Sequence, residues 1–118
     1  MEQRANSPNA IGERLRALLA VTSLAIRDMA HVTGTSERHV VEWLEGGITP
    51  PRGRMNRLAQ QTGVTLAWIY YGDDGRLGPL MATRLRLAVD RDKADRARAT
   101  LSDGSSYDAT VGKPRPIA

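Results

Sequence analysis

Arginine is the residue type in this chain whose chemistry is most suited to binding phosphate groups and other hydrogen-bond acceptors. Of the 17 basic residues, 15 are arginine, and the net charge is +4. The planar guanidinium group donates paired hydrogen bonds to phosphate groups and guanine edges, whereas lysine acts as a point charge. The codon bias of a GC-rich genome would also enrich arginine, so the composition is compatible with nucleic-acid binding without establishing it.

Residue types that act in catalysis or bind metals are sparse by comparison. The chain has no cysteine, which excludes disulfides, thiolate zinc sites and a cysteine nucleophile. His31 and His39 have no suitable carboxylate cluster, and Asp73-Asp74-Gly75 is too short for a calcium loop. No Ser, His and Asp set has a supporting motif, and no glycine-rich phosphate loop follows a strand. We therefore predict no enzyme activity, no metal site and no cofactor.

The composition also bears on where the protein works. A chain without cysteine is typical of a reducing cytoplasm. Residues 17–26 (ALLAVTSLAI) resemble the apolar part of a secretion signal, but Arg27 and Asp28 follow them without a small-residue cleavage site. We interpret the run as two helices meeting. No stretch approaches the roughly 18 to 20 apolar residues of a membrane-spanning helix, so we expect a cytoplasmic protein without membrane contact.

Apolar residues recur at helical spacing up to residue 72 and predict five short helices. Asn9, Ser36 and Thr65 are placed to act as N-caps, and Gly34 and Gly63 as helix stops. We expect helices at about residues 10–20 and 53–62, one of about nine residues ending before Gly34, one between Ser36 and Gly46, and a short one after Thr65. The residues expected to form the core are Ile11, Leu15, Leu18, Leu19, Ile26, Met29, Ala30, Val40, Trp43, Leu44, Met55, Leu58, Ala59, Leu66, Trp68 and Ile69.

A cluster of turn residues separates the expected helical core from the C-terminal part of the chain. Turn residues cluster at 72–75, so we expect one domain over residues 9–72, whose core ends there, and an extension over residues 73–118. Residues 80–101 contain strong helix formers, with Pro79 at a favourable first position.

The same segment also alternates as a strand would, at Leu85, Leu87 and Val89. Two structures therefore fit: a helix over residues 79–101, or a short hairpin turning at Asp103-Gly104. Residues 112–118 contain two prolines and are expected to form a flexible tail. We favour the helix.

Ala30, Gly34, Val40 and Trp43 form the informative pattern of the chain. A small residue at 30 allows two helices to approach, Gly34 permits a tight turn, and Val40 with Trp43 anchors the following helix from beneath. With these residues the chain resembles the lambda-repressor-like, or XRE-type, family of helix-turn-helix regulators, and the resemblance continues through GVTLAWIYYG at residues 63–72. It implies an all-α, five-helix DNA-binding domain. A generic helical bundle with a glycine turn is the alternative.

The resemblance also implies a DNA-binding face. In the family the third helix lies in the major groove, where exposed side chains touch base edges. Arg38 is the strongest candidate, because a bidentate arginine contact to guanine discriminates by about 1 to 3 kcal/mol; the alternative is an exposed ion pair with Glu42, worth about 0.3 to 0.5 kcal/mol. The implied base-contacting residues are Glu37, Arg38, Val41 and Glu42, and the implied phosphate-contacting residues are Arg27, Thr35, Ser36, Arg52 and Arg54.

The chain departs from the family pattern in three ways. The second helix usually begins with a phosphate-binding Gln behind a Thr or Ser cap, but Ile26 and Ala25 stand there. A buried Arg and Glu pair is replaced by Leu19 and Leu44, which we predict to touch, since well-packed apolar groups can replace a buried ion pair without loss of stability. The third helix is acidic, which weakens attraction to DNA.

The function implied is that of a bacterial or phage transcriptional regulator in the nucleoid, which binds double-stranded DNA as a homodimer on a palindromic operator. The dimer surface is expected within residues 79–101 or on the fourth and fifth helices. Within residues 79–101, apolar residues recur every seven positions, at Leu80, Leu87, Ala94 and Leu101. The alternative is an antitoxin or adaptor that binds a partner protein through residues 79–118. No peptidase domain fits in the chain, so self-cleavage is not expected.

Overall fold

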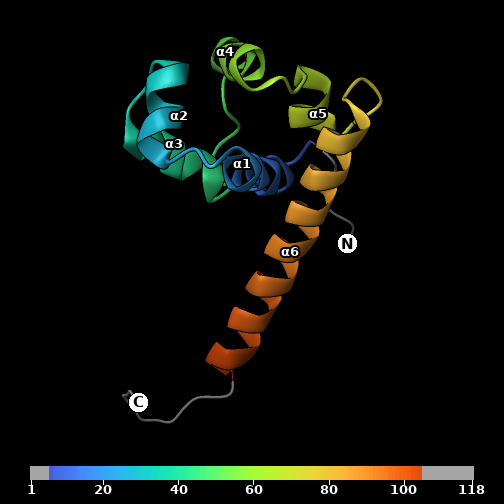
Figure 1. The fold of residues 1–118 in the computed structure, drawn as a ribbon. Helices are drawn as coiled ribbons and strands as arrows, with labels where there is room; N and C mark the ends of the chain where they lie inside the picture. Colours follow the sequence, from blue (N-terminus) through green and yellow to red (C-terminus); the bar gives the residue numbers. More distant parts are fainter. Residues whose placement is uncertain (1–5, 105–118) are drawn as a thin grey trace.

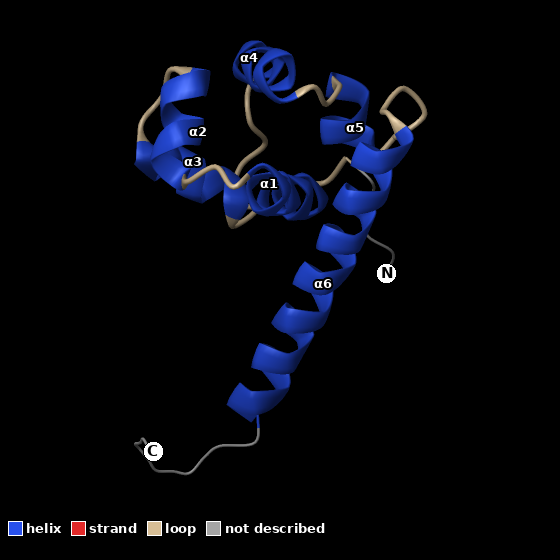
Figure 2. Cartoon of the chain, in the orientation of Figure 1, coloured by secondary structure: helices blue, strands red, loops and turns tan. Residues whose placement is uncertain are grey.

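The computed structural model describes residues 6–104, and side chains for residues 6–99. Within this part the chain is all-α and forms no strand (Figure 2). None of its helices is long and apolar enough to cross a bilayer. The helices of the described part are α1 (Pro8–Thr22), α2 (Ile26–Thr33), α3 (Glu37–Leu44), α4 (Arg52–Thr62), α5 (Leu66–Tyr71) and α6 (Pro79–Gly104).

The first five helices close on one another around α1. Helix α1 packs against α3 and α5, α2 packs against α3 and α4, and α4 packs against α5. Helix α6 crosses α1 on the side away from α2, and its C-terminal end projects beyond the other helices (Figure 1). The result is a small helical body with one long helix attached to its first helix.

Local signals explain most helix ends. Ser36 Oγ accepts from the His39 N–H at 3.2 Å, and Thr65 Oγ1 accepts from the Trp68 N–H at 3.0 Å, so both predicted N-caps are confirmed. Gly34 ends α2 with φ 74°, as a left-handed C-cap requires. The expected cap at Asn9 is wrong. Ser7 takes this role.

Helix α1 begins earlier than predicted because two neighbouring residues favour an earlier start. Ser7 Oγ accepts from the Ala10 N–H at 3.1 Å. Pro8 then occupies the first turn, where its fixed φ suits a helix and its missing N–H costs nothing. A serine followed by proline is therefore a stronger start signal than the asparagine one residue later.

The predicted apolar faces meet in one core. Leu19, Ile26 and Leu66 are only partly buried and pack against its edge. Leu19 and Leu44 thus belong to the same packed assembly, while their direct contact stays a prediction. The buried residues of the cluster are Ile11, Leu15, Leu18, Met29, Ala30, Val40, Trp43, Leu44, Met55, Leu58, Ala59, Val64, Trp68, Ile69, Tyr70 and Leu85.

Leu85 corrects two expectations about the C-terminal segment. It is 0% exposed and belongs to the core cluster, so the core does not end near residue 72. Residues 79–104 are helical, so the hairpin is wrong for this segment. The alternation at 85, 87 and 89 arises because Leu85 and Val89, four residues apart, share the side facing α1, whereas Leu87 points outward. The tail predicted at residues 112–118 lies outside the described residues.

Gly12 allows α1 and α3 to approach closely. A Cβ atom at this position would lie 2.8 Å from the Leu44 carbonyl oxygen and 2.9 Å from that of Trp43. Both oxygens belong to the backbone and cannot rotate away as a side chain can. Any larger residue at 12 would therefore move the end of α3 relative to the core.

Candidate nucleic-acid interface

Helix α3 is anchored by one face and exposed on the other. Val40, Trp43 and Leu44 are buried, and Trp43 retains only 2% of its exposure. The helix is eight residues long, so three buried side chains within two turns fix its rotation about its own axis. This rotation places the remaining positions of α3 in solvent.

The exposed positions of α3 are Glu37, Arg38, His39, Val41 and Glu42. The four residues expected to contact bases, Glu37, Arg38, Val41 and Glu42, are all among them, and together we call these four the α3 face. Val41 is 42% exposed although it is apolar. Among the described residues, Arg38 forms no ion pair or hydrogen bond, and the alternative pair with Glu42 is not formed. The Arg38 guanidinium is therefore available to an external acceptor.

The start of α3 carries a small polar network. Thr35 Oγ1 lies 2.9 Å from Nδ1 of His39, and Ser36 Oγ accepts from the His39 N–H. A hydroxyl group has one donor and two acceptor positions, so the Ser36 O–H can still donate to a phosphate while its oxygen caps the helix. Thr35 and Ser36 thus stabilise the start of α3, and their hydroxyl groups can also bind a ligand.

Arg54 and Arg57 cover the turn between α2 and α3. Arg54 Nη1 donates to the carbonyl oxygens of Thr33 at 2.9 Å and Gly34 at 2.6 Å, which satisfies the C-terminal end of α2. A Cβ atom at Gly34 would meet Nη1 of Arg57 at 2.8 Å and Nη1 of Arg54 at 3.0 Å. Gly34 thus provides both the positive φ and the space for two guanidinium groups.

Arg57 was not predicted from the sequence as a contact residue, although a signal for it was present. Arg57 follows Arg54 by three residues on a helix whose buried face is formed by Met55, Leu58 and Ala59. Residues three apart lie on the same side of a helix, so Arg57 shares the exposed side with Arg54. It is exposed and has no partner within residues 6–104.

Arg52 and Arg27 flank this region differently. The Arg52 guanidinium lies 5.4 Å from the centroid of the Tyr70 ring, a cation–π distance, and the Tyr70 hydroxyl donates to the Pro50 carbonyl oxygen at 2.8 Å. Burial raises the pKa of Tyr70, and the Arg52 charge opposes this shift. Arg27 is exposed near the start of α2 and has no partner in the described part of the chain.

The start of α2 compensates for its missing cap side chain. Asp28 Oδ2 accepts from the Ala25 N–H at 2.8 Å, so the carboxylate satisfies one backbone donor from within the helix. Ile26, the first residue of α2, is half-buried against the core. It therefore contributes apolar packing, and no polar contact, at the start of the helix.

The end of α3 is tied to α1 and α6 by Arg16, which the sequence analysis also missed. Arg16 Nη1 donates to the Leu44 carbonyl oxygen, and Arg16 Nη2 lies 2.8 Å from Asp92 Oδ2 in α6. Arg96 lies 3.6 Å from Asp92 and 4.0 Å from Glu45. A cation from α1 thus holds the last turn of α3 through a backbone carbonyl group and links it to α6.

No protein-family model, curated protein or solved structure matches the chain. The assignment of a function therefore depends on the geometry. Within residues 6–104, no three His, Cys, Asp or Glu side chains gather as a metal site would require.

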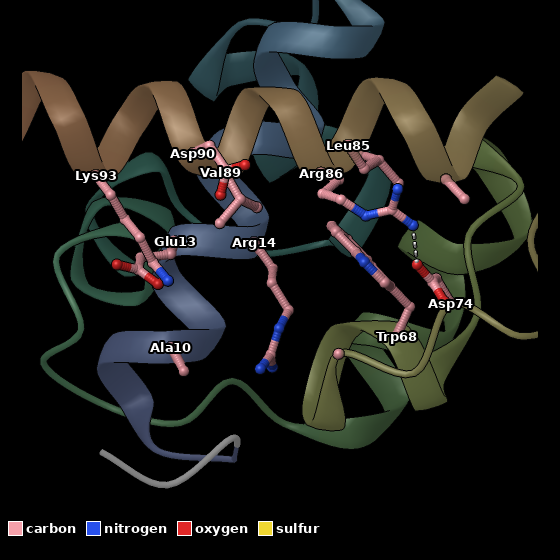
Figure 3. Close-up of a pocket in the computed structure, with 12 residues that line it drawn as sticks. Ala10, Glu13, Arg14, Trp68, Asp74, Leu85, Arg86, Val89, Asp90 and Lys93 are labelled. Atoms are coloured by element: carbon pink, nitrogen blue, oxygen red, sulfur yellow. Dashed lines mark hydrogen bonds and ion pairs between the residues drawn. The ribbon is translucent and has the colours of Figure 1, made fainter. Parts of the chain in front are cut away.

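A cavity of about 340 Å³ between α1, α5 and α6 provides a contrast to the α3 face (Figure 3). Arg14 donates to the Ile69 carbonyl oxygen at 2.9 Å, and its burial lowers its pKa while Glu13 opposes the shift. Arg86 and Asp74 form an exposed pair at 3.1 Å. Charges of both signs line this cavity, so it favours neither an anionic nor a cationic ligand. The arginines beside the turn between α2 and α3, in contrast, are all cations and suit an anion.

Proposed function

We propose that this chain is a sequence-specific DNA-binding transcriptional regulator built on a lambda-repressor-like helix-turn-helix, with α2 and α3 as the motif. The observation that carries the proposal is the orientation of α3. Its apolar residues Val40 and Trp43 are buried, while Arg38 on the opposite side is exposed and forms no hydrogen bond or ion pair within the described residues. This is the arrangement that a helix needs in order to enter a major groove.

The α3 face supplies chemistry for reading bases. Arg38 can donate two hydrogen bonds to guanine O6 and N7. Glu37 and Glu42 can accept from cytosine N4, and exposed Val41 can contact a thymine methyl group. The two carboxylates repel phosphates, so they favour sites where they face a donor and oppose binding elsewhere.

The surrounding cations supply the contacts that position such a helix on the backbone. Arg27 in α2 and Arg52 at the start of α4 are exposed, and Arg57 stands beside the turn. Arg54 uses one nitrogen to hold α2 and keeps other donors for a phosphate. Thr35 and Ser36 complete the proposed set. Phosphate contacts of this kind raise affinity for all sequences and make it salt-dependent.

A single copy offers few base contacts, so we propose binding as a homodimer to an operator with two-fold symmetry in the bacterial nucleoid. The half-sites would then lie about 34 Å apart, or one helical turn of DNA. Helices α4 and α5 are the surfaces proposed for the dimer contact.

The test is selection of bound DNA from a random duplex pool by the purified chain, followed by affinity measurement on the selected site. Enrichment of a two-fold-symmetric sequence is expected. Arg38→Ala should weaken binding to that sequence about 5- to 150-fold and binding to random DNA much less. Arg76→Ala is the matched control, since Arg76 is exposed, lies in the loop before α6 and forms no hydrogen bond or ion pair within residues 6–104. Absence of enrichment at low salt would refute the proposal.

A second candidate is an antitoxin or adaptor that binds a partner protein through residues 79–118. It is favoured by Leu80 and Leu87 of α6, which are large, apolar and exposed. The two functions are compatible, because α3 and the outer side of α6 belong to different surfaces.

A further inference from the structure

The outer side of α6 exposes apolar side chains that no described residue covers. Leu80 and Leu87 are each 64% exposed, more than any other large apolar side chain described. They lie seven residues apart, two helical turns, and exposed Ala94 continues the same line. Leu85 and Asp92 occupy the opposite side, against α1. We call Leu80, Leu87 and Ala94 the α6 stripe.

A groove of about 410 Å³ adjoins this stripe between α1 and α6. Its apolar lining comes from Ala17, Ala20, Val21, Leu87 and Ala88. Small side chains from both helices leave the hollow, and Leu87 belongs to both the groove and the stripe. A side chain of leucine size from another helix can enter it, as in recognition of an amphipathic helix by a groove.

Cations flank the stripe on both sides. Arg84 and Arg91 each follow a stripe leucine by four residues, and Arg86 and Lys93 each precede a stripe residue by one. Arg84, Arg91 and Lys93 have no partner within the described chain.

The acidic residues nearby offset the charge of the two flanks unequally. Asp92 faces inward and pairs with Arg16, and Asp95 pairs with Arg98 at 2.5 Å. Asp90 is exposed but has no ion-pair partner among the described residues. The flank with Arg84 and Arg91 is therefore basic, whereas on the other flank Asp74 pairs with Arg86 and Asp90 offsets the charge of Lys93.

The charge pattern distinguishes among possible occupants of this surface. A second copy of α6 would place arginines opposite arginines or lysines, whether the helices ran parallel or antiparallel, and such like-charge pairs are unfavourable. The chain's own residues 105–118 carry Lys113 and Arg115 against Asp108, so they do not complement it either. Duplex DNA would satisfy the cations but would leave the exposed leucines in water.

We propose that the α6 stripe and the adjoining groove are a docking site for an acidic amphipathic helix of a partner protein. The partner's apolar side chains occupy the groove beside Leu87, and its carboxylates face Arg84 and Arg91. The site is independent of the α3 face, so it holds whether or not the chain binds DNA.

The probe is a helical peptide of about 18 residues, or five turns, with leucines along one face and glutamates on its flanks. A matched peptide carries lysine at every glutamate position. Binding to the full chain is measured by fluorescence anisotropy at two salt concentrations. The acidic peptide should bind more tightly, and salt should weaken it.

Variants of the chain identify the surface used. Leu87→Ala should weaken acidic-peptide binding about tenfold, as expected for a central apolar contact. Arg84→Glu combined with Arg91→Glu should weaken it about 3- to 30-fold, the sum of several exposed charge pairs. Arg76→Glu is the control and should change little. All of these side chains are exposed, so circular dichroism should show an unchanged fold.

Three results would overturn the proposal. Equal affinity for both peptides would show that the cations beside the stripe do not select an acidic partner. Self-association of the chain that Leu87→Ala abolishes, measured by sedimentation, would identify a second copy as the occupant. The third result is a random DNA duplex that displaces the acidic peptide and no longer binds the Arg84→Glu, Arg91→Glu chain. That result would identify nucleic acid as the occupant. An Arg38→Ala chain that no longer binds DNA but still binds the acidic peptide would support two separate sites.

Discussion

The close approach of α1 and α3 at Gly12 allows a quantitative test of how α3 is held. Gly12→Ala adds one methyl group in the middle of α1. Its carbon would lie 2.8 Å from the Leu44 oxygen and 2.9 Å from the Trp43 oxygen. Contacting carbon atoms usually lie about 3.5 Å or more from their neighbours, so the end of α3 must shift by about half an ångström.

The magnitude follows from two opposing effects. Overpacking of a well-packed contact costs about 1 to 3 kcal/mol, and the upper part of that range applies because both obstacles are backbone atoms. Alanine is intrinsically better than glycine inside a helix by about 0.5 to 1 kcal/mol. The net expectation is a loss of about 1 to 2 kcal/mol in the free energy of unfolding. For a domain of this size the melting temperature should fall by about 5 to 15 °C.

Gly53→Ala is the matched control. Gly53 lies in the first turn of α4, and a Cβ atom there would meet nothing within 4 Å. The control should be neutral or slightly stabilising, since only the helix preference remains. Thermal unfolding followed by circular dichroism, with urea unfolding as a second measure, compares both variants with the parent chain. Equal stability of the Gly12→Ala variant and the parent would show that α1 and α3 are not packed this closely.

Three further predictions concern the core, the α6 attachment and pH. Trp43→Ala removes a buried aromatic side chain and should lower the free energy of unfolding by about 3 to 5 kcal/mol, measured by urea unfolding. Asp92→Ala leaves Arg16 without its partner in a partly buried contact and should cost about 1 to 2 kcal/mol; hydrogen exchange should become faster in α6, and unchanged exchange there would contradict the role of this pair. Because burial raises the folded-state pKa of Tyr70, its contribution to stability is complete below the unfolded value of about 10 and is lost as the pH rises through the folded value. Tyr70→Phe should therefore reduce the fall in stability above about pH 10, and an identical alkaline profile for both chains would refute this assignment.

Arg16 and Arg54 have a common role in the structure around α3. Each donates from a guanidinium group to backbone carbonyl oxygens at the end of a helix: Arg16 to Leu44 in α3, and Arg54 to Thr33 and Gly34 after α2. Carbonyl groups at helix ends lack partners within the helix and carry partial negative charge. Part of the arginine content therefore stabilises the fold, and an external anion is left to the other arginines and to the Arg54 donors that do not hold α2.

The α6 helix shows where sequence patterns were ambiguous. Strong helix formers and alternating leucines supported different structures for the same residues. Packing against α1 decides between them, because a helix buries Leu85 and pairs Asp92 with Arg16 on one side. A strand would have needed a neighbouring strand for its backbone groups, and none exists in residues 6–104.

Local features of the protein could be predicted from neighbouring residues alone. Ser36, Thr65 and Gly34 mark helix ends through hydrogen bonds and φ values that involve only the nearest few residues. Helical spacing likewise predicted that Val40 and Trp43 would be buried and that Arg38 would be exposed, because one turn of helix relates those positions directly.

The contacts between residues far apart in the chain become visible only once the helices are packed together. The contact of Arg16 with Leu44 spans 28 positions and its contact with Asp92 spans 76, so no local pattern could reveal either. The need for glycine at position 12 depends on the distance between two helix axes, and the use of Arg54 depends on where α4 lies over the end of α2. These distances result from packing the whole core at once, which is why they are absent from the spacing of residues along the chain.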